Sequence, residues 1–252
     1  MPRHLLLRLE APLAAFGDVM IDRIGPVRET PAASTVSGLL ANALGLYRWD
    51  VAALGRLQDR IVFGCRVDRR GVRFTDFQTA QLAKRDVGWT TRGAAEGRDG
   101  GDATYESPHI RERDYHADAC VTVALRLHEP DDAPTLDDVV RALDEPVRPL
   151  FLGRKPCLPA GPLLVGEIDA PTVYEALLIA PFEGRGPTGR RHAVDDVLRV
   201  VLPAGEPRPP GFRDVRASER RDWPAGVHAG ELLTHHGDVP RAAFVALTAS
   251  VP

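Results

Sequence analysis

Residues 23–45 decide how the chain is organised, and they read RIGPVRETPAASTVSGLLANALG. A glycine and two prolines disfavour regular structure in the first part of this stretch, so we expect a loop there. The apolar residues that follow recur at helical spacing, which predicts a helix capped by Ser34 or Thr35. Gly45 is the expected end of this helix, because glycine readily adopts the left-handed conformation that ends helices.

The start of this helix is a candidate anion site. Arg23 and Arg28 place two guanidiniums in the preceding loop, and the free N–H groups and dipole of a helix N-terminus favour negative charge. Ser34, Ser37 and Gly38 would line such a site, and Gly38 favours close approach by a ligand or by another element. An ordinary packed helix with a polar cap is the alternative interpretation.

The composition describes a soluble globular protein. The 252 residues suffice for one large domain or two small ones, 44% of them are apolar, and the net charge is −3. This acidity argues against an indiscriminate nucleic-acid binder, but it leaves room for a local basic groove. Lys84 and Lys155 are the only lysines, so nearly every cation is an arginine, whose planar fork suits phosphate.

The sequence predicts neither a metal site nor a cofactor. Cys65, Cys120 and Cys157 are far apart without a CxxC pair, which argues against zinc and against a disulfide framework. No Walker loop, HExxH, GxSxG or dinucleotide fingerprint occurs. His235 and His236 would point to opposite sides of an extended segment, so we interpret this part as a solvated tail. We find no signal peptide or membrane span and expect a cytoplasmic protein without a membrane partner.

The first 150 residues follow the order strand, helix, hairpin, strand, helix. Strands are expected at 4–9, 60–68, 72–79 and 117–127, and helices at 36–44, 50–57 and 135–143. A tight turn at 69–71 would join the second and third strands as a hairpin. This order is close to the βαββαβ layout of ferredoxin-like, RRM-like RNA-recognition domains.

We therefore expect an α+β protein with two parts. Residues 1–150 would form the RRM-like domain, with a flexible arm at 80–116, where glycines and charges interrupt the periodicity. Residues 151–252 are proline-rich and would form a smaller β-rich C-terminal region. Its strands are expected at 163–168, 176–179, 194–202 and 242–247, while 150–157 lies where the last strand of the first domain should be.

Two further segments carry residues that suit RNA. Gly153, Arg154 and Lys155 place a glycine and two adjacent cations after an apolar strand end, next to which a backbone phosphate would fit. A surface turn is the alternative interpretation. Residues 105–115 mix aromatic rings with arginines, as in arms that stack single strands, although their acidic residues also fit a solvated hairpin.

Taken in order, four stretches resemble the CasD-type RAMP subunits of the type I-E CRISPR Cascade complex. They are LLRLEAPLAAFG at 6–17, residues 31–46, CRVD at 65–68 with DFQT at 76–79, and RDYHADA at 113–119 followed by FLGRKPC at 151–157. The chain departs from the family at 31–38, where a lysine or arginine commonly precedes Ser-Gly. It also departs at Phe16, where tryptophan is usual.

This resemblance implies a non-catalytic RNA-binding subunit of a Cascade surveillance complex in antiviral defence. It implies that the arm is a thumb hairpin, and that the chain caps the 5′ handle of the CRISPR RNA (crRNA) and contacts neighbouring backbone and large subunits. Target DNA would be met only indirectly, through the complex. The residues that we expect to bind RNA are Arg23, Arg28, Ser34, Ser37, Gly38, Gln78, Tyr105, His109, Arg111, Arg113, Gly153, Arg154 and Lys155.

Arg113 is the arm position that best matches the family motif. The ferredoxin-like order lets Arg28, Arg113 and Arg154 converge on one edge of the domain. Arg56, Arg69 and Arg148 are expected elsewhere, and Arg69, in an expected exposed turn, would be the control in a binding experiment.

Two other functions stay open. A related subtype's homologue is a metal-independent endoribonuclease that cleaves the CRISPR repeat, and such cleavage needs a base near the 2′-hydroxyl and a cation for the developing charge. The candidates for these roles are Tyr105, His109, His116 and Lys155. A protein-interaction module without RNA contact is the third hypothesis.

Overall fold

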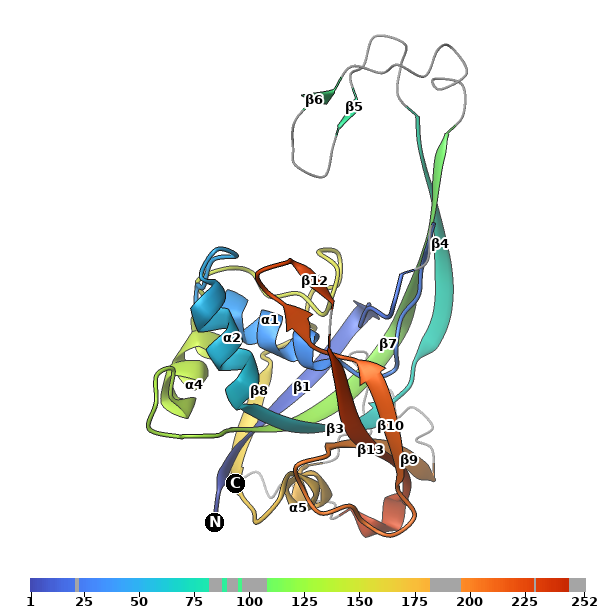
Figure 1. Cartoon of the computed structure of the whole chain (residues 1–252). Coiled ribbons are helices and arrows are strands. Elements are labelled where there is room, and N and C mark those ends of the chain that lie inside the picture. Colours follow the sequence, from blue (N-terminus) through green and yellow to red (C-terminus); the bar gives the residue numbers. More distant parts are fainter. Residues whose placement is uncertain are drawn as a thin grey trace.

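The computed structural model of the chain describes residues 1–20, 23–81, 108–181, 196–228 and 230–244, with the backbone of 88–89 and 95–96. These residues form a mixed α+β protein, as predicted, in which a large sheet carries helices on both faces (Figure 1). Tyr105 and most of the expected arm lie outside the described residues.

The main sheet has nine strands, and seven of them follow the spatial order β10-β13-β9-β3-β7-β1-β8, while β2 and β4 also pair with β7. Neighbouring strands are antiparallel except for β2, which is parallel to β7. The strands are β1 (Arg3–Ala14), β2 (Ile24–Gly25), β3 (Ile61–Arg69), β4 (Val72–Ala80), β7 (His109–Leu127), β8 (Leu164–Asp169), β9 (Val197–Pro203), β10 (Arg213–Ser218) and β13 (Glu231–Pro240). Two short pairs lie outside this sheet, namely β5 (Gly88–Trp89) with β6 (Ala95–Glu96), and β11 (Arg221–Asp222) with β12 (Val227–His228).

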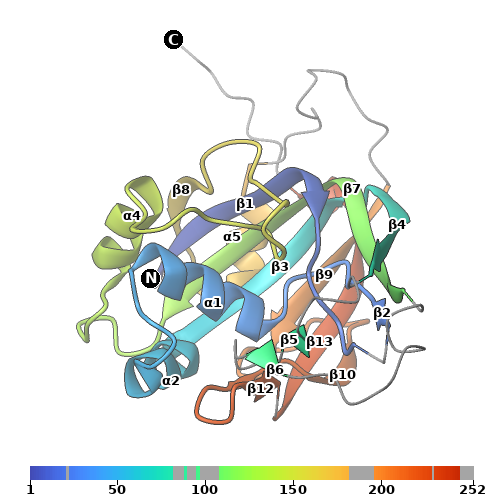
Figure 2. The same ribbon diagram turned by 90° about the horizontal axis from the view of Figure 1, so that it is seen from above.

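The helices divide between the two faces of the sheet. They are α1 (Ala33–Ala43), α2 (Val51–Arg60), α4 (Leu136–Asp144), α5 (Val173–Ile179) and the 3-10 turn Arg241–Ala243. Helices α1, α2 and α4 cover one face, and α5 covers the other (Figures 1 and 2). In the described part of the chain, no helix combines the length and the apolar character that crossing a membrane requires.

Helix α4 begins where the sequence predicts, with Thr135 as its N-cap residue. The Thr135 hydroxyl accepts a hydrogen bond from the Asp138 N–H, and the Asp138 carboxylate accepts one from the Thr135 N–H. This capping box satisfies two backbone donors that a helix start otherwise leaves unpaired.

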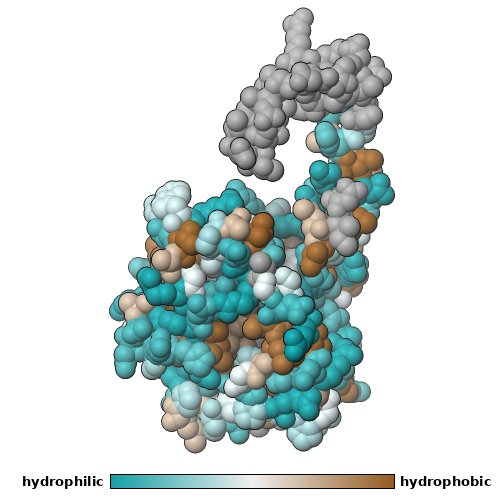
Figure 3. Space-filling model, viewed as in Figure 1, coloured by the Kyte–Doolittle hydropathy of each residue, from teal (hydrophilic) through white to brown (hydrophobic). Residues whose placement is uncertain are grey.

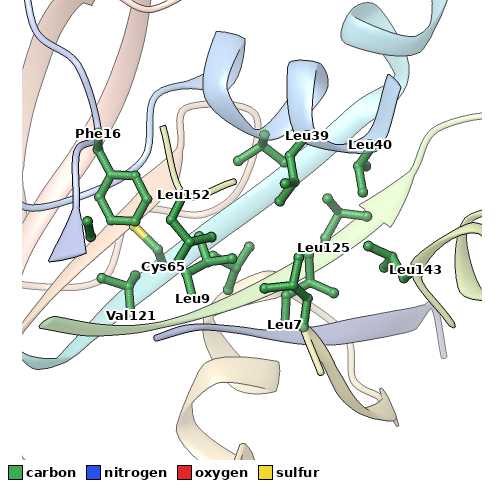
Figure 4. Close-up of a cluster of buried hydrophobic side chains, with 14 of the residues drawn as sticks. Leu7, Leu9, Phe16, Leu39, Leu40, Cys65, Val121, Leu125, Leu143 and Leu152 are labelled. Carbon is green, nitrogen blue, oxygen red and sulfur yellow. The ribbon is translucent and has the colours of Figure 1, made fainter. Parts of the chain in front are cut away.

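Strand β1 contributes to two cores, because its side chains alternate between the two faces of the sheet. Leu5, Leu7 and Leu9 pack with side chains of α1, α2 and α4 on one face, and Leu6 packs with α5 on the other. Figure 4 shows the first core, in which side chains of α1 approach those of β1 and β7. Burial on both faces explains why Leu5, Leu6 and Leu7 are consecutive apolar residues rather than alternating with polar ones.

Helix α1 forms as predicted, but its predicted cap is wrong. Neither Ser34 nor Thr35 caps it; instead the Glu219 carboxylate accepts a hydrogen bond from the Ala33 N–H at 3.2 Å. The backbone carbonyl of Glu219 accepts a second one from the Ser34 N–H at 2.8 Å. Gly45 ends the helix as predicted, with a positive φ of 80°. Tertiary structure brings in a distant carboxylate that local sequence could not indicate.

Strands β3 and β4 do not form the predicted hairpin. Both pair with β7, β3 along its C-terminal part and β4 along its N-terminal part, so they follow one another beside a single long strand. Gly71 lies between them with a φ of +69°, and a Cβ there would overlap the carbonyl oxygen of Ala117. Strand β7 is 19 residues long and includes 109–116, which the sequence analysis assigned to the irregular arm.

The outer parts of β4 and β7 project from the body of the molecule as a two-stranded ribbon (Figure 1). Every residue of β4 is exposed or half-buried, including the apolar side chains of Val72, Phe74 and Phe77. Figure 3 shows hydrophobic residues at the surface along this ribbon. The Phe74 ring stacks on that of Tyr115, with ring centroids 5.5 Å apart, which steadies the base of the ribbon.

Two segments expected as strands in the second half of the chain have another structure, and a third is described only in part. Residues 176–179 belong to helix α5, because the Thr172 hydroxyl caps it by accepting from the Glu175 N–H. Residues 150–157 form turns and bends, and the strand that completes this side of the sheet is β8, paired with β1. The segment expected as a strand at 242–247 begins in the 3-10 turn, and its last three residues lie outside the described range.

The segment containing His235 and His236 is not a solvated tail. It is strand β13, which lies inside the sheet between β10 and β9. His235 Nδ1 lies 2.8 Å from the Asp214 carboxylate, and His236 Nε2 lies 3.0 Å from the Thr234 hydroxyl, so both polar rings find partners in the sheet. One sheet thus includes strands from both sides of residue 150, and the domain division expected there stays a prediction.

Candidate nucleic-acid interface

A groove of about 1080 Å³ lies between helix α1 and segments that are distant from it in sequence. Its other walls come from residues 15–20 after β1, from the turn at 151–155, and from the C-terminal segment 218–228. Gln58 of α2 holds this last segment against the helices, because its side chain exchanges hydrogen bonds of 3.0 and 3.1 Å with the backbone of Arg221. Both views accordingly show β12 beside α1 (Figures 1 and 2).

The groove is locally basic in a chain whose net charge is negative. The described residues that line it include four cationic side chains and one carboxylate. The cations are Arg48, Arg154, Lys155 and Arg221, and the carboxylate is that of Asp18. Such a local excess of cations attracts phosphate groups and raises their concentration at the surface.

Arg48 and Arg221 are cations of this groove that the sequence analysis missed. Within the described residues neither of them forms an ion pair with a carboxylate. The Arg221 guanidinium lies over the Trp223 ring, 5.5 Å from its centroid, and donates to the Gly226 carbonyl at 2.8 Å. Burial, together with the positive charge of Arg48, lowers the pKa of Arg221. Two arginines that line the same groove favour an anion beside them.

The turn at 151–155 brings Gly153 and Lys155 to the groove. Gly153 has a φ of +101°, and a Cβ there would overlap the Ala15 carbonyl oxygen, so the turn packs against the end of β1 only with glycine at this position. Lys155 is exposed, and its ammonium is available to a ligand in the groove.

Arg154 and Arg113 converge, as expected, on the backbone of Gly25. A Cβ at Gly25 would lie within 3.0 Å of both guanidiniums, at 2.9 Å from Arg154 and 3.0 Å from Arg113. Arg154 donates to the carbonyl oxygens of Asp114 at 2.7 Å and Gly25 at 2.9 Å. Arg113 Nη1 lies 3.4 Å from the sulfur of Met20, which lines the groove. The basic surface therefore continues from the groove to the base of the ribbon.

Arg28 does not join this pair, which corrects the expected convergence of three arginines. Its guanidinium pairs with the buried carboxylate of Glu219, and its side chain is 14% exposed. Glu219 therefore occupies the N-terminus of α1, where we expected an anionic ligand. The Ser37 hydroxyl is buried and donates within its own helix at 2.9 Å, so it is not available either. Ser34 and Gly38 do line the groove, with open space at Gly38.

Arg69 is not the exposed turn residue that the sequence analysis expected. Its guanidinium donates to the Glu10 carboxylate and to the Asp118 carbonyl, each at 2.6 Å, and its side chain is 12% exposed. Replacing Arg69 would therefore break a part-buried ion pair. Arg56, which is exposed on α2, is the better control for binding experiments.

Three further described site residues lie on the ribbon, away from the groove. Gln78 faces Arg111 across the β4–β7 pair, and both side chains are exposed. His109 pairs with Ala80 at the outer end of the ribbon. These residues form a second group of polar side chains, which the 19-residue strand β7 links to the first.

Neighbouring side chains neutralise two acidic residues of this ribbon, Glu112 and Asp114. Glu112 lies 3.3 Å from Arg23, and Asp114 accepts hydrogen bonds from Arg73 at 2.5 Å and Thr75 at 2.6 Å. The Thr75 hydroxyl and the Arg73 guanidinium hold the pKa of Asp114 below its usual range. These carboxylates therefore do not cancel the charge of the other ribbon arginines.

The candidates for RNA cleavage do not assemble within the described residues. His109 and His116 are seven positions apart on one strand, which separates them by about 23 Å. His116 is buried, and burial lowers its pKa, while Lys155 belongs to the groove. No group of three or more His, Cys, Asp or Glu in the described part of the chain is placed to hold a metal ion.

The fold and the groove define a class of protein, an antiparallel α+β scaffold with a basic groove and a projecting ribbon. Comparison of the sequence with known proteins shows the family to which the chain belongs. Residues 4–234 match the family described as CRISPR-associated protein (Cas_Cas5). The chain is 31% identical over 178 residues to the CRISPR system Cascade subunit CasD of Escherichia coli strain K12, across 71% of this chain and 77% of that protein. The chain therefore belongs to the CRISPR-associated Cas5 family, which confirms the family resemblance.

Solved structures resemble the chain over almost its whole length. A chain of a "CRISPR RNA-guided surveillance complex" has a TM-score of 0.66 and 25% identity, covering 96% of this chain and 93% of that one. The "Crystal structure of Cas protein" has a TM-score of 0.59 and 26% identity, covering 96% and 97%. The similarity thus includes the C-terminal third, in which no family segment was found by inspection of the sequence.

The sequence did contain a signal for the residues that were missed. Tyr-Arg-Trp at 47–49 and Arg-Arg-Asp-Trp at 220–223 interleave cations with aromatic rings, a pattern common on nucleic-acid-binding surfaces. They are 171 positions apart from Trp49 to Arg220, and nothing local indicates that they share a groove.

Proposed function

We propose that the chain is a non-catalytic, RNA-binding Cascade subunit that caps the 5′ handle of crRNA and contacts neighbouring backbone and large subunits. The observation that carries this proposal is the groove, where Arg48, Arg154, Lys155 and Arg221 meet from three separate segments. Clustered arginines of this kind bind phosphate through charge-assisted, often bidentate hydrogen bonds. The name of the relative CasD, a Cascade subunit, supports the same assignment.

The proposal includes a ferredoxin-like core with a thumb. Strands β3, β7, β1 and β8 are adjacent in the sheet, with α1 and α2 between β1 and β3 in the chain, and α4 between β7 and β8. This connectivity supports a ferredoxin-like βαββαβ core. The ribbon of β4 and β7 would be the base of the thumb, and its exposed apolar side chains, Val72 and Phe77 among them, would face a neighbouring subunit.

A binding and cleavage experiment tests the function. The purified full-length chain is titrated with labelled CRISPR repeat RNA, with and without EDTA, and the RNA is then examined for cleavage. We expect saturable binding and intact RNA in both conditions. Site-specific cleavage that disappears in a His109→Ala variant would instead support the endoribonuclease hypothesis. Absence of binding under low-salt conditions would support a protein-interaction module.

A further inference from the structure

The loop between α1 and α2 carries two aromatic rings that the proposed function does not yet use. The rings of Tyr47 and Trp49 stack on one another, with centroids 4.6 Å apart and planes within 6°. Both are well exposed, Tyr47 by 52% and Trp49 by 74%. Parallel aromatic rings at a protein surface leave a flat apolar face in water, which is unfavourable unless a ligand covers it.

Arg148 holds the Tyr47 ring of this stack in place. The guanidinium carbon of Arg148 lies 4.6 Å from the centroid of the Tyr47 ring, and its N–H groups donate to the carbonyl oxygens of Leu46 at 3.0 Å and Gly45 at 2.8 Å. The Tyr47 ring thus contacts two flat groups, the indole of Trp49 and the guanidinium of Arg148. Trp49 is the more exposed of the two rings.

The backbone of the loop is ordered by its own hydrogen bonds. The Tyr47 N–H donates to the Asp50 carboxylate at 2.7 Å, and the Asp50 N–H donates to the Tyr47 carbonyl at 3.0 Å. A ligand that stacks on Trp49 therefore meets a preformed surface and loses little affinity to ordering of the loop.

The surroundings of the stack favour a nucleobase over an aromatic side chain of a protein. Arg48, between the two rings in sequence, is exposed and lines the basic groove together with Tyr47. A nucleotide of single-stranded RNA presents both a flat base and an adjacent phosphate, whereas an aromatic side chain presents only the flat ring.

We propose that Trp49 is a stacking subsite for one unpaired base of single-stranded RNA, with Arg48 contacting a phosphate of the same strand. This inference rests on the proposed RNA-binding function and extends the binding site beyond the groove to the loop at 44–50. Base stacking tolerates different bases, because every base has a π-face. The subsite therefore contributes affinity rather than sequence preference.

The test compares variants of the full-length chain in salt-controlled titrations with a short, fluorescently labelled single-stranded RNA. Trp49→Ala should weaken binding roughly 5- to 150-fold, the equivalent of about 1–3 kcal/mol for one stacked base. The slope of log K against log salt should stay unchanged, because no charge is lost. Arg48→Ala should reduce this slope by about 0.7, the value for one phosphate contact on a single strand.

Conservative and chemical controls separate stacking from structural damage. Trp49→Phe should retain most of the affinity, and Val197→Ala, which removes an exposed apolar side chain on β9, should bind like the wild type. An RNA in which the bases are replaced one at a time by abasic sites should show one position at which Trp49→Ala has no further effect.

Each remaining result decides against a defined part of the proposal. If the wild type binds RNA and Trp49→Ala binds equally well, the stacking subsite is wrong while the RNA-binding function stands. If RNA affinity is unchanged but assembly with a neighbouring subunit is lost, the stack binds protein and the proposal is overturned. If the wild type binds no RNA, the proposed function fails and the subsite with it.

Discussion

Glu219 lies 186 positions after Ala33, the residue whose N–H it accepts at the start of α1. The start of a helix leaves backbone N–H groups unpaired and favours a negative charge. Here the carboxylate of Glu219 both accepts a hydrogen bond from one of these N–H groups and provides the negative charge. The same carboxylate neutralises Arg28 in a part-buried ion pair. One side chain thus joins the loop before α1, the helix itself and the C-terminal segment that forms a wall of the groove.

We therefore expect Glu219→Ala to destabilise the protein by roughly 2–4 kcal/mol, because it leaves the Arg28 charge part-buried and unpaired and removes a helix cap. Urea unfolding monitored by circular dichroism measures the change. Glu231→Ala, at an exposed carboxylate on β13, is the matched control and should shift stability by less than about 0.5 kcal/mol. Equal unfolding midpoints for the two variants would contradict the role of Glu219.

His236 makes the stability of the fold depend on pH. Burial, reinforced by nearby arginines such as Arg199, lowers its pKa to about 4 in the folded protein. The pKa returns to about 6.5 in the unfolded chain, so the unfolded state binds the proton first as the pH falls. The contribution of His236 is complete above pH 6.5 and is lost progressively as the pH falls toward 4.

We expect His236→Gln to reduce the loss of stability between pH 7 and pH 4.5 by on the order of 2 kcal/mol. The free energy of unfolding in urea at a series of pH values checks this. The His236→Gln variant keeps a slope of the same sign from His4 and His116, whose pKa values burial also lowers. An identical pH profile for His236→Gln and the wild type would overturn the assignment.

Among the elements, β7 determines the architecture, because β1, β2, β3 and β4 all pair with it. The passage from β3 to β4 along this strand depends on Gly71, whose φ is +69° and whose Cα faces the backbone of β7 at Ala117. Gly55, in the interior of α2, is in the opposite situation, because nothing lies within 4 Å of a Cβ at that position.

This contrast gives a paired prediction. Gly71→Ala should destabilise the protein by roughly 1–3 kcal/mol, because the side chain would strain the backbone and push β3–β4 away from β7. Gly55→Ala should stabilise it by roughly 0.5–1 kcal/mol, because alanine loses less backbone entropy in a helix. Thermal or urea unfolding measures both, and shifts of the same sign would show that the path of β3 and β4 is wrong.

At the scale of the whole molecule, the distribution of charge over the surface matters more for RNA binding than the net charge. The chain carries a net charge of −3, but the groove and the adjoining pair of Arg113 and Arg154 gather cations on one side. Binding of RNA should accordingly be strong at low salt and weaken steeply as salt is added, because the release of counterions from the RNA then gains less free energy.

Arg113→Ala should weaken binding of the 5′-handle RNA by one to two decades, because a charge-assisted contact contributes roughly 1.5–3 kcal/mol. Its thermal stability should stay close to that of the wild type, since Arg113 is half-buried and its described contacts are with Met20 and the backbone at Gly25. Arg56→Ala is the control. Equal affinities of the two variants in a salt-controlled titration would place the RNA elsewhere.

The sequence by itself determined the class of fold, the family, helix α1 with its end at Gly45, and the cap of α4 at Thr135. These features depend on residues close together in the chain, through periodicity, glycine conformation and local hydrogen bonds. The sequence also pointed to Gly153, Arg154 and Lys155, which are contiguous and line the groove; their role in binding RNA stays a prediction.

Tertiary structure alone decided the cap of α1, the path of β3 and β4 along β7, and the meeting of Arg48 with Arg221 across the groove. In each case the partner lies far away in the chain, and its placement follows from which strands pair. Strand pairing depends on the free energy of the whole sheet and its two cores, and no local pattern of residues carries that information.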